Sequence, residues 1–287
     1  MSTAAEDLAL PDDALVAALE SIAVDVARSA GRLVVDERPD AVEVASTKST
    51  ATDVVTVMDQ RSQDHLIARL RKARPDDAVL GEESGGASGT SGITWVIDPI
   101  DGTVNYLYGI PAYAVSVAAV VGDPTTPGAW RPCAGAVFNP VTDEMYVARA
   151  GGGARLVLEG DERRLIPTAC TELGQALVGT GFGYAAERRE RQARLLLDIL
   201  PQIRDIRRIG SAALDLCGVA AGGLDAYYET GLNPWDLAAG WLIAAEAGAV
   251  VGGLDGPGEE LTWACGPGLN SVFPDLVKAG TLRHLNG

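Results

Sequence analysis

The N-terminal part of the chain carries apolar residues at the spacing of an α-helix. From Leu15 to Val26 they recur every three or four positions, with polar residues between them. This period places the apolar side chains on one face, so the pattern predicts an amphipathic helix from about Asp12 to Asp36. Pro39 follows, and the helix is expected to end before it.

A second helix is predicted after a polar segment. The segment, STKSTATDVVTVMD, is rich in Ser and Thr, and from about Gln60 to Ala73 apolar residues again fall at helical spacing. Leu66, Ile67 and Leu70 are expected to face inward. The next stretch, AVLGEESGGASGTSG, predicts a short strand that leads into a loop rich in Gly and Ser.

Between residues 93 and 166 the pattern is that of β-strands. Five apolar stretches, ITWVI, YAVSVAAVV, CAGAVF, EMYVA and ARLVLE, are separated by Gly, Pro and Asn-Pro. Because no helical stretch lies between them, they predict an antiparallel sheet.

After this sheet, strands and helices alternate. The stretches ALVGTGF, RDIRRI, DAYYE and AVV are strand-like, and helices are expected near 185–200, 211–221 and 237–247. The sequence therefore predicts an α/β protein of the α+β type. Its N-terminal subdomain, over 1–166, has two helices on an antiparallel sheet, and an α/β subdomain covers 167–287.

The chain is strongly acidic. It has 287 residues, with 39 Asp and Glu against 23 Lys and Arg, and a net charge of −16. No general affinity for nucleic acid is expected, and a small anionic substrate needs local positive charge from metal ions or backbone N–H groups. The N-terminus lacks the basic and apolar regions of a signal peptide, and no apolar run reaches the roughly 18 residues of a membrane span. We expect a cytoplasmic protein with no membrane partner.

Histidine and cysteine offer little chemistry. His65 and His284 are expected at the surface, which leaves little basis for a Ser-His-Asp triad or a His-ligated zinc site. The four cysteines lie far apart without a C-x-x-C motif and are expected to be reduced, mostly buried thiols. Any chemistry then has to come from carboxylates.

Carboxylates stand at the ends of four apolar stretches, beside a glycine or a helix start. They are Asp59 in VVTVMD, Glu82 and Glu83 in VLGEES, Asp98 and Asp101 in WVIDPIDGT, and Asp236 in NPWDLAAGW. Each has a simpler interpretation when taken alone. Asp59 and Asp236 suit helix caps or first-turn charges, GEES suits a solvated loop, and DPIDG suits a turn.

The combination of these acids favours a metal site. Carboxylates at the ends of buried strands are costly unless a cation neutralises them, and these segments are short of Lys and Arg, with Lys48 as the candidate for neutralisation. Mg²⁺ prefers oxygen ligands, and two such ions can act on both sides of a phosphoryl transfer. Gly102 and Thr103 follow Asp101 and offer backbone N–H groups and a hydroxyl to an anion.

Four blocks of the sequence resemble those of the inositol monophosphatases, and most closely the bacterial SuhB-type branch. They are TKSTATDVVTVMD, GEES, WVIDPIDGTVNY and RRIGSAALDLCGVAAGGLDAYYETGLNPWDLAAG. The resemblance covers about Leu15 to Gly248 in matching order, and the pair D-P-I-D-G-T and W-D-x-A-A-G is highly specific. It implies the layered αβαβα sandwich of the inositol monophosphatase / fructose-1,6-bisphosphatase superfamily. It also implies a Mg²⁺-dependent, lithium-sensitive phosphomonoesterase that forms a homodimer.

The resemblance further implies roles for individual residues. Two to three Mg²⁺ ions bind per subunit, and the implied ligands are Glu82, Asp98, the carbonyl of Ile100, Asp101 and Asp236, with Asp98 bridging two ions. Thr103, paired with Asp59, and Glu82 are implied to orient and deprotonate the attacking water. The implied substrate-binding residues are Asp101, Gly102, Thr103, Gly210, Ser211, Ala212, Glu229 and Asp236. Lys48 and Asp53 are implied to lie on a flap over the metals.

The chain departs from the family pattern at two positions. Gln63 stands where the family often has Glu, and we expect a change of helix surface or packing without loss of activity. Tyr106 stands where Phe is common, which is a conservative change, although Tyr106 and Tyr108 could alter the mouth of the site.

The residues leave the substrate open. Myo-inositol 1-phosphate fits an acid such as Glu229, whose simpler interpretation is a solvated charge at a strand end. Histidinol phosphate, fructose 1,6-bisphosphate and 3'-phosphoadenosine 5'-phosphate are alternatives on the same fold. A bisphosphate requires a second basic pocket, for which Arg188 and Arg189 are candidates. The arginines of RDIRR could help to bind an anion, but at a strand edge their simpler interpretation is that they are solvated or paired. A regulatory interaction role on this scaffold is the remaining alternative.

Overall fold

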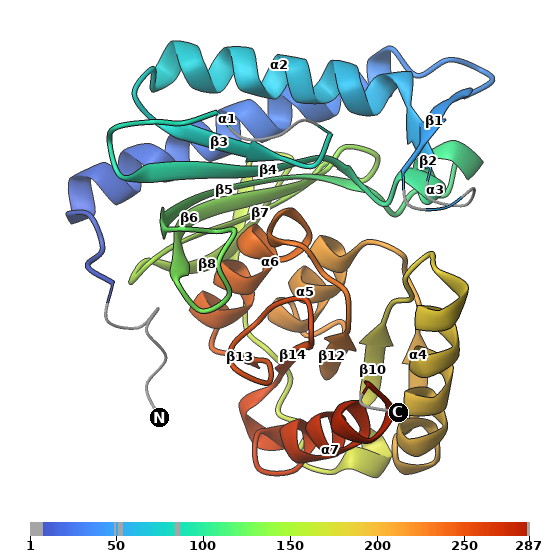
Figure 1. Cartoon of the computed structure of the whole chain (residues 1–287). Helices are drawn as coiled ribbons and strands as arrows, with labels where there is room; N and C mark the ends of the chain where they lie inside the picture. Colours follow the sequence, from blue (N-terminus) through green and yellow to red (C-terminus); the bar gives the residue numbers. More distant parts are fainter. Residues whose placement is uncertain (1–7, 49, 51–53, 84–86, 286–287) are drawn as a thin grey trace.

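The computed structural model describes residues 8–48, 50, 54–83 and 87–285, and these residues form five layers (Figure 1). Two helices, α1 (Asp13–Asp36) and α2 (Val57–Ala73), cover one face of a seven-stranded sheet. Helices α5 (Ala212–Ala220) and α6 (Pro234–Ala247) lie between that sheet and a five-stranded one. Helices α4 (Ala186–Ile199) and α7 (Phe273–Leu285) cover the outer face of the second sheet. The αβαβα prediction is confirmed.

The seven-stranded sheet has the order β3-β4-β5-β6-β7-β8-β9. Its strands are β3 (Ala78–Gly81), β4 (Ile93–Asp101), β5 (Ala114–Gly122), β6 (Trp130–Asn139), β7 (Glu144–Arg149), β8 (Gly153–Leu158) and β9 (Asp161–Arg164). Strands β4 to β8 pair antiparallel as predicted, and β9, which the sequence pattern did not reveal, pairs antiparallel with β8. Strand β3 runs parallel to β4. This places the C-terminal ends of β3 and β4 at the same edge.

The central strands of this sheet are buried on both faces, which explains their nearly continuous apolar sequence. Trp95 and Ile97 of β4 face the core beneath α1 and α2, whereas Val96 faces the core that contains α5 and α6. Helix α6, from the second half of the chain, therefore packs directly on the first sheet. The proposed division at residue 166 remains a prediction.

The five-stranded sheet has the order β11-β10-β12-β14-β13. Strands β11 (Asp205–Arg207), β10 (Leu177–Thr180) and β12 (Ala226–Glu229) are parallel, while β14 (Thr262–Cys265) is antiparallel to both β12 and β13 (Val250–Gly252). The sequence pattern did not reveal β14 and α7, which follow a segment rich in Gly and Pro. A small two-stranded sheet, β1 (Val44–Thr47) and β2 (Val54–Thr56), and the short helix α3 (Thr103–Tyr108) complete these elements.

Three of the four cysteines, Cys133, Cys217 and Cys265, are buried free thiols, and Cys170 is partly exposed, as the sequence predicted. The histidines differ from the expectation of a free surface position. His65 is partly buried against the hydroxyl of Ser29, and His284 pairs with Asp198. Among the described residues, no helix combines the length and the apolar character needed to cross a bilayer.

Asp77, at the start of β3, is a buried acid that joins α2 to the first sheet. Its carboxylate accepts hydrogen bonds from Arg74 at 2.8 and 2.9 Å and from Trp95 Nε1 at 2.9 Å. Burial alone raises the pKa of Asp77, but the hydrogen bonds from Arg74, Ser91 and Trp95 outweigh it and hold the pKa below its usual value.

The variant Asp77→Ala is expected to lower the free energy of unfolding by about 2–3 kcal/mol, since Trp95 Nε1 is left buried without a partner. Chemical denaturation at neutral pH measures this loss, with Asp76→Ala, an exposed neighbour, as the control. Because the folded pKa is lowered, the contribution is present above the unfolded pKa of about 3.9 and disappears as the pH falls through the folded pKa. Equal stabilities of the two variants at pH 7 would contradict this role.

Candidate active site

A β-bulge at the end of β4 brings Asp98 and Asp101 to one side. Residues three apart on a regular strand point to opposite faces, but the register with β5 slips by one residue between Asp98, opposite Ser116, and Asp101, opposite Ala114. The extra residue turns the second carboxylate toward the first. The bulge is fixed in part by the hydrogen bond from Ile100 N to Asp98 Oδ1, 3.0 Å long.

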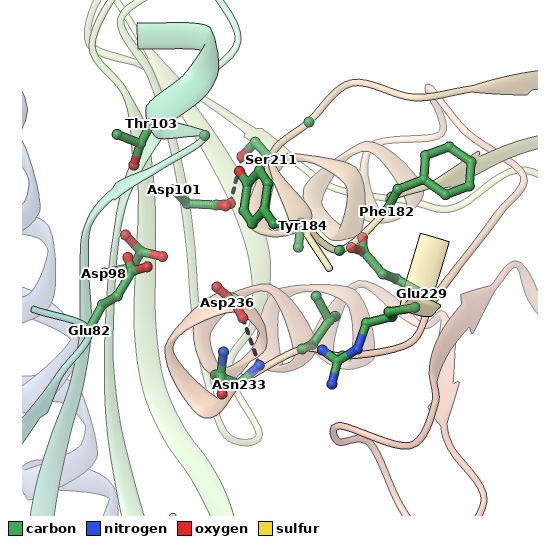
Figure 2. Close-up of a pocket in the computed structure, with 18 of the residues that line it drawn as sticks. Glu82, Asp98, Asp101, Thr103, Phe182, Tyr184, Ser211, Glu229, Asn233 and Asp236 are labelled. Carbon is green, nitrogen blue, oxygen red and sulfur yellow. Dashed lines mark hydrogen bonds between the residues drawn. The ribbon is translucent and has the colours of Figure 1, made fainter. Parts of the chain in front are cut away.

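Two further acids reach the same place from other elements (Figure 2). Asp236 lies in the first turn of α6, where its carboxylate accepts a 2.7 Å hydrogen bond from Asn233 N. Asp98, Asp101 and Asp236 each offer an oxygen atom within 4.8 Å of the others. Glu82 follows β3, and because β3 and β4 are parallel neighbours, its carboxyl group lies against that of Asp98. The four acids predicted from the sequence therefore share one cavity.

The concentration of buried negative charge raises the pKa values of all four acids. Burial raises the pKa of Glu82 to about 7, against the opposing effect of Lys48. Burial also raises the pKa of Asp101 to about 6, although Ser211 Oγ and Ala213 N donate hydrogen bonds to it at 2.6 and 2.7 Å. The pKa values of Asp98 and Asp236 lie well above the usual range, because burial is reinforced by the neighbouring carboxylates.

This donor set fits hard divalent cations. It offers only oxygen atoms, and its charge is destabilising without a cation. Lys48 supplies part of the compensation, since its Nζ lies 2.6 Å from Glu82 Oε1 and 2.7 Å from Glu83 Oε1. A single ammonium group cannot neutralise the four acids. Asp53, the other residue expected on the flap, lies outside the described residues.

Thr103 and Asp59 form a second part of the site. Thr103 Oγ1 lies 2.9 Å from Asp59 Oδ1 and 3.0 Å from the carbonyl oxygen of Ile100. Asp59 is fully buried, and its other oxygen accepts a 2.7 Å hydrogen bond from Thr56 N. Thr56 is the N-cap of α2 and Asp59 is the third helical residue, so the helix begins three residues earlier than predicted and Asp59 is not its N-cap.

Gly102 lies next to Thr103 in a conformation that requires glycine. Its φ is +98°, and an added Cβ atom would lie 3.0 Å from the carbonyl oxygen of Ala112 and 3.1 Å from that of Gly210. The turn therefore joins the end of β4 to the segment 210–212, which precedes α5. Asp101 is hydrogen-bonded to this segment as well, so the two halves of the chain are fixed to each other at the site.

Glu229, at the end of β12, lies on the cavity wall and is not a freely solvated strand end. Tyr227 donates a hydrogen bond to it from its hydroxyl, at 2.7 Å. Burial raises the pKa of Glu229 to about 7, with this hydrogen bond opposing the effect. Gly210, Ser211 and Ala212 line the same cavity, but the hydroxyl of Ser211 is already hydrogen-bonded to Asp101.

Gln63 and Tyr106, the two residues that depart from the family pattern, both lie in the interior of the protein. Gln63 is buried and does not lie on the helix surface. Its Oε1 accepts a hydrogen bond from Glu83 N at 2.9 Å, so it fixes the loop that carries Glu82. Tyr106 is fully buried against Tyr113 and Arg38 and does not line the cavity, which agrees with a conservative change and excludes the alternative that Tyr106 alters the mouth of the site.

The cavity has a volume of about 540 Å³ and contains residues that the sequence did not single out. These are Phe182, Tyr184, Arg191, Arg208 and Asn233. Arg208, in the stretch interpreted as solvated or paired, belongs to this wall. Apart from the anion-binding alternative for RDIRR, no sequence signal marked these residues, because the chain brings them to the acids only through the packing of the second sheet.

Comparisons with known proteins agree on one family. The family model described as "Inositol monophosphatase family" matches residues 16–277. The chain is 51% identical over 251 residues to the Mycobacterium leprae protein named inositol-1-monophosphatase, which covers 84% of this chain and 81% of that protein. It is 37% identical over 246 residues to the Nus factor SuhB of Pasteurella multocida, covering 84% and 87%. The solved structure of Mycobacterium tuberculosis SuhB has a TM-score of 0.77 at 45% identity and covers 92% of this chain and 97% of its own.

Proposed function

Because this chain belongs to the inositol monophosphatase family, a family of phosphomonoesterases, we propose that it hydrolyses myo-inositol 1-phosphate to inositol and phosphate and requires Mg²⁺. The observation that carries the proposal is the convergence of Glu82, Asp98, Asp101 and Asp236 in one cavity. The name of the Mycobacterium leprae relative supports the choice of substrate.

Two to three Mg²⁺ ions are proposed per subunit. Glu82, Asp98 and the carbonyl of Ile100 would hold one ion, and Asp98, Asp101 and Asp236 a second. When bound, the ions supply positive charge that stabilises the phosphoryl group and the leaving oxygen during displacement. Lithium sensitivity, a homodimer and a flap that includes Lys48 and Asp53 belong to the same proposal.

The protein's own groups position the nucleophile and take up its proton. We assign to Thr103 Oγ1, held by Asp59 Oδ1, the orientation of the attacking water, and to Glu82 the uptake of its proton. Backbone N–H groups of Gly102 and Thr103 are proposed to bind phosphoryl oxygens. A covalent phospho-enzyme is not expected, because this cavity presents no Cys or His among the described residues, its aspartates are assigned to metal binding, and the Ser211 hydroxyl is hydrogen-bonded to Asp101.

The polyol is proposed to lie against the second half of the chain. Glu229, Asp101 and Asp236 can accept hydrogen bonds from its hydroxyl groups, with the segment Gly210, Ser211 and Ala212 beside them. Phosphate release from myo-inositol 1-phosphate, compared with histidinol phosphate, fructose 1,6-bisphosphate and 3'-phosphoadenosine 5'-phosphate, with and without Mg²⁺ and Li⁺, tests this assignment. Release that does not depend on Mg²⁺ would contradict it.

A regulatory interaction is a second candidate, because the Pasteurella multocida relative is named a Nus factor. This chain keeps all four acids, so an interaction would accompany catalysis rather than replace it. Capture of partners by wild type and by Asp98→Asn separates the two roles. A partner bound equally by both proteins supports an interaction that is independent of the metal site.

Gly181 controls the position of Glu229. An added Cβ at Gly181 would lie 2.0 Å from Glu229 Oε2, so the variant Gly181→Ala must displace that carboxylate. We expect about a tenfold lower kcat/KM for myo-inositol 1-phosphate, mainly through KM, since a charge-assisted hydrogen bond to the polyol is lost. Hydrolysis of p-nitrophenyl phosphate, which has no polyol hydroxyls, should fall much less. Gly174→Ala, where no atom lies within 4 Å of the added Cβ, is the control. Equal losses on both substrates would refute the role of Glu229.

A further inference from the structure

Arginines line the part of the cavity formed by the second half of the chain. Arg188 and Arg191 lie three residues apart on α4, which places them on the same side of the helix, and Arg208 follows β11. The chain as a whole has a net charge of −16. A local cluster of three guanidinium groups in one cavity is therefore a specific feature of this site, and the reaction proposed above does not use it.

The cavity wall is shaped around two of these side chains. At Gly231, where φ is +96°, an added Cβ would lie 2.4 Å from Arg188 Nη1, and at Gly210, where φ is +94°, it would lie 2.5 Å from Arg208 Nη1. Both guanidinium groups therefore lie directly on glycine backbone, where any larger residue would displace them. Asn233, which precedes α6, lines the same cavity.

The existing partners of these arginines leave them able to bind an anion. Arg191 Nε is buried without a hydrogen-bond partner among the described residues. Arg188 pairs with Glu259 at 3.0 Å, but both side chains are substantially exposed, and such surface pairs are weak. Arg208 is exposed at the cavity and lies within electrostatic range of Asp101 and Glu229.

Arg189, which the sequence suggested together with Arg188, does not belong to this group. Its Nε donates a 2.7 Å hydrogen bond to the carbonyl oxygen of Gly183, and it lines a neighbouring groove but not the cavity of the acids, whereas Arg208 lines both. The structure thus replaces Arg189 by Arg191 and Arg208 as candidates for a second basic pocket.

We propose that Arg188, Arg191 and Arg208 form a second anion subsite, and that this enzyme prefers a phosphorylated alcohol that carries a second anionic group. The proposal rests on the function proposed above, because the first phosphate is the one hydrolysed at the acidic cluster. Guanidinium groups bind phosphate and carboxylate oxygens through paired N–H donors. Tyr184, which lies beside Asp101 and Ser211 (Figure 2), and Phe182 line the same cavity and provide apolar surface in it. A cationic alcohol such as histidinol is disfavoured by the same positive charge.

A matched pair of substrates tests the preference. Myo-inositol 1-phosphate and myo-inositol 1,4-bisphosphate differ only in the second phosphate. Initial rates of phosphate release should give a kcat/KM about tenfold higher for the bisphosphate, as one charge-assisted contact provides. Fructose 1-phosphate and fructose 1,6-bisphosphate form a second such pair. Hydrolysis of the monophosphate without any preference for the bisphosphate would overturn the subsite and leave the proposed function intact.

Variants connect the preference to the arginines. Arg191→Gln and Arg208→Gln should each reduce the ratio of the two kcat/KM values, and the double variant should lose the whole preference of about tenfold. Arg194→Gln, on the same helix but paired with Glu190 outside the cavity, should keep the wild-type ratio. If Arg208→Gln lowers both kcat/KM values by the same factor, Arg208 acts only as an internal counter-charge to the acids and the proposal fails for it.

Binding without turnover separates the subsite from catalysis. In EDTA the acidic cluster repels anions. The arginines are then the main binding groups, while Lys48, Gly102 and Thr103 line the same cavity and are unchanged in the variants. Inorganic phosphate at constant ionic strength should then raise the Tm of wild type, and the double variant Arg191→Gln/Arg208→Gln should lose this rise. An equal rise in both proteins, or none in wild type, would contradict the subsite, whatever the result of the hydrolysis assays.

Discussion

Replacing Asp98 with Asn is expected to lower kcat by about a thousandfold or more while the protein stays folded. Asp98 lies at the centre of the acidic cluster, in contact with Glu82 and within 4.8 Å of oxygen atoms of Asp101 and Asp236. It is the one acid proposed to contact two Mg²⁺ ions. Asn keeps the shape and one oxygen ligand but removes the negative charge. Phosphate release from myo-inositol 1-phosphate measures the loss.

The fold should tolerate this substitution, because the four acids destabilise the metal-free protein. Removing one charge relieves repulsion, so the Tm of Asp98→Asn in EDTA should equal or exceed that of wild type. Asp161→Asn, in the exposed strand β9, is the control for an acid outside the site. A folded Asp98→Asn protein with near wild-type kcat would exclude the proposed metal site.

The stability of the metal-free protein is expected to depend on pH in the direction opposite to that set by Asp77. The pKa values of Asp101, about 6, and Glu82, about 7, are raised in the folded chain mainly by burial. The folded chain therefore holds protons that the unfolded chain releases near pH 4, and stability contributed by these groups is lost as the pH rises from about 4 to 7. In EDTA, the Tm advantage of Asp98→Asn over wild type should grow between pH 5 and 8.

Mg²⁺ should reverse this effect in wild type. At a concentration about 100 times its Kd, an ion that binds only the folded protein adds about 2.7 kcal/mol, or roughly 5 °C in Tm. Thermal unfolding with and without Mg²⁺ at several pH values measures it. A wild-type Tm that does not change on addition of Mg²⁺ would contradict the account. An equal rise in the Tm of wild type and of Asp98→Asn would contradict it as well.

Much of the fold follows from local pattern. The apolar run of β4 is continuous because both faces of the sheet are covered, and the acids at its end were recognisable because charges rarely close a buried strand. The register slip that brings Asp98 and Asp101 to the same side was not predictable from spacing alone. It depends on pairing with β5, which is a non-local contact.

The cavity residues from the second half of the chain were also largely unpredictable from the sequence, because non-local contacts bring them to the site. Arg191 resembles any charged residue on a solvated helix, and Arg208 any charged residue at a strand edge. Only the packing of the second sheet against α5 and α6 turns them toward the acids from β3 and β4. Gln63 and Tyr106 show the same limit, because the sequence left open whether each lies in the packed interior, and tertiary contacts bury both fully.

The central claim is that acids from four separate segments bind paired divalent ions. A crystal grown with Mn²⁺ and measured at its absorption edge tests it directly. We expect two anomalous peaks roughly 3.5–4 Å apart, both within coordination distance of Asp98, one also contacting Glu82 and the other Asp101 and Asp236. A fully occupied Mn²⁺ site elsewhere, with no peak between these four carboxylates, would contradict the account.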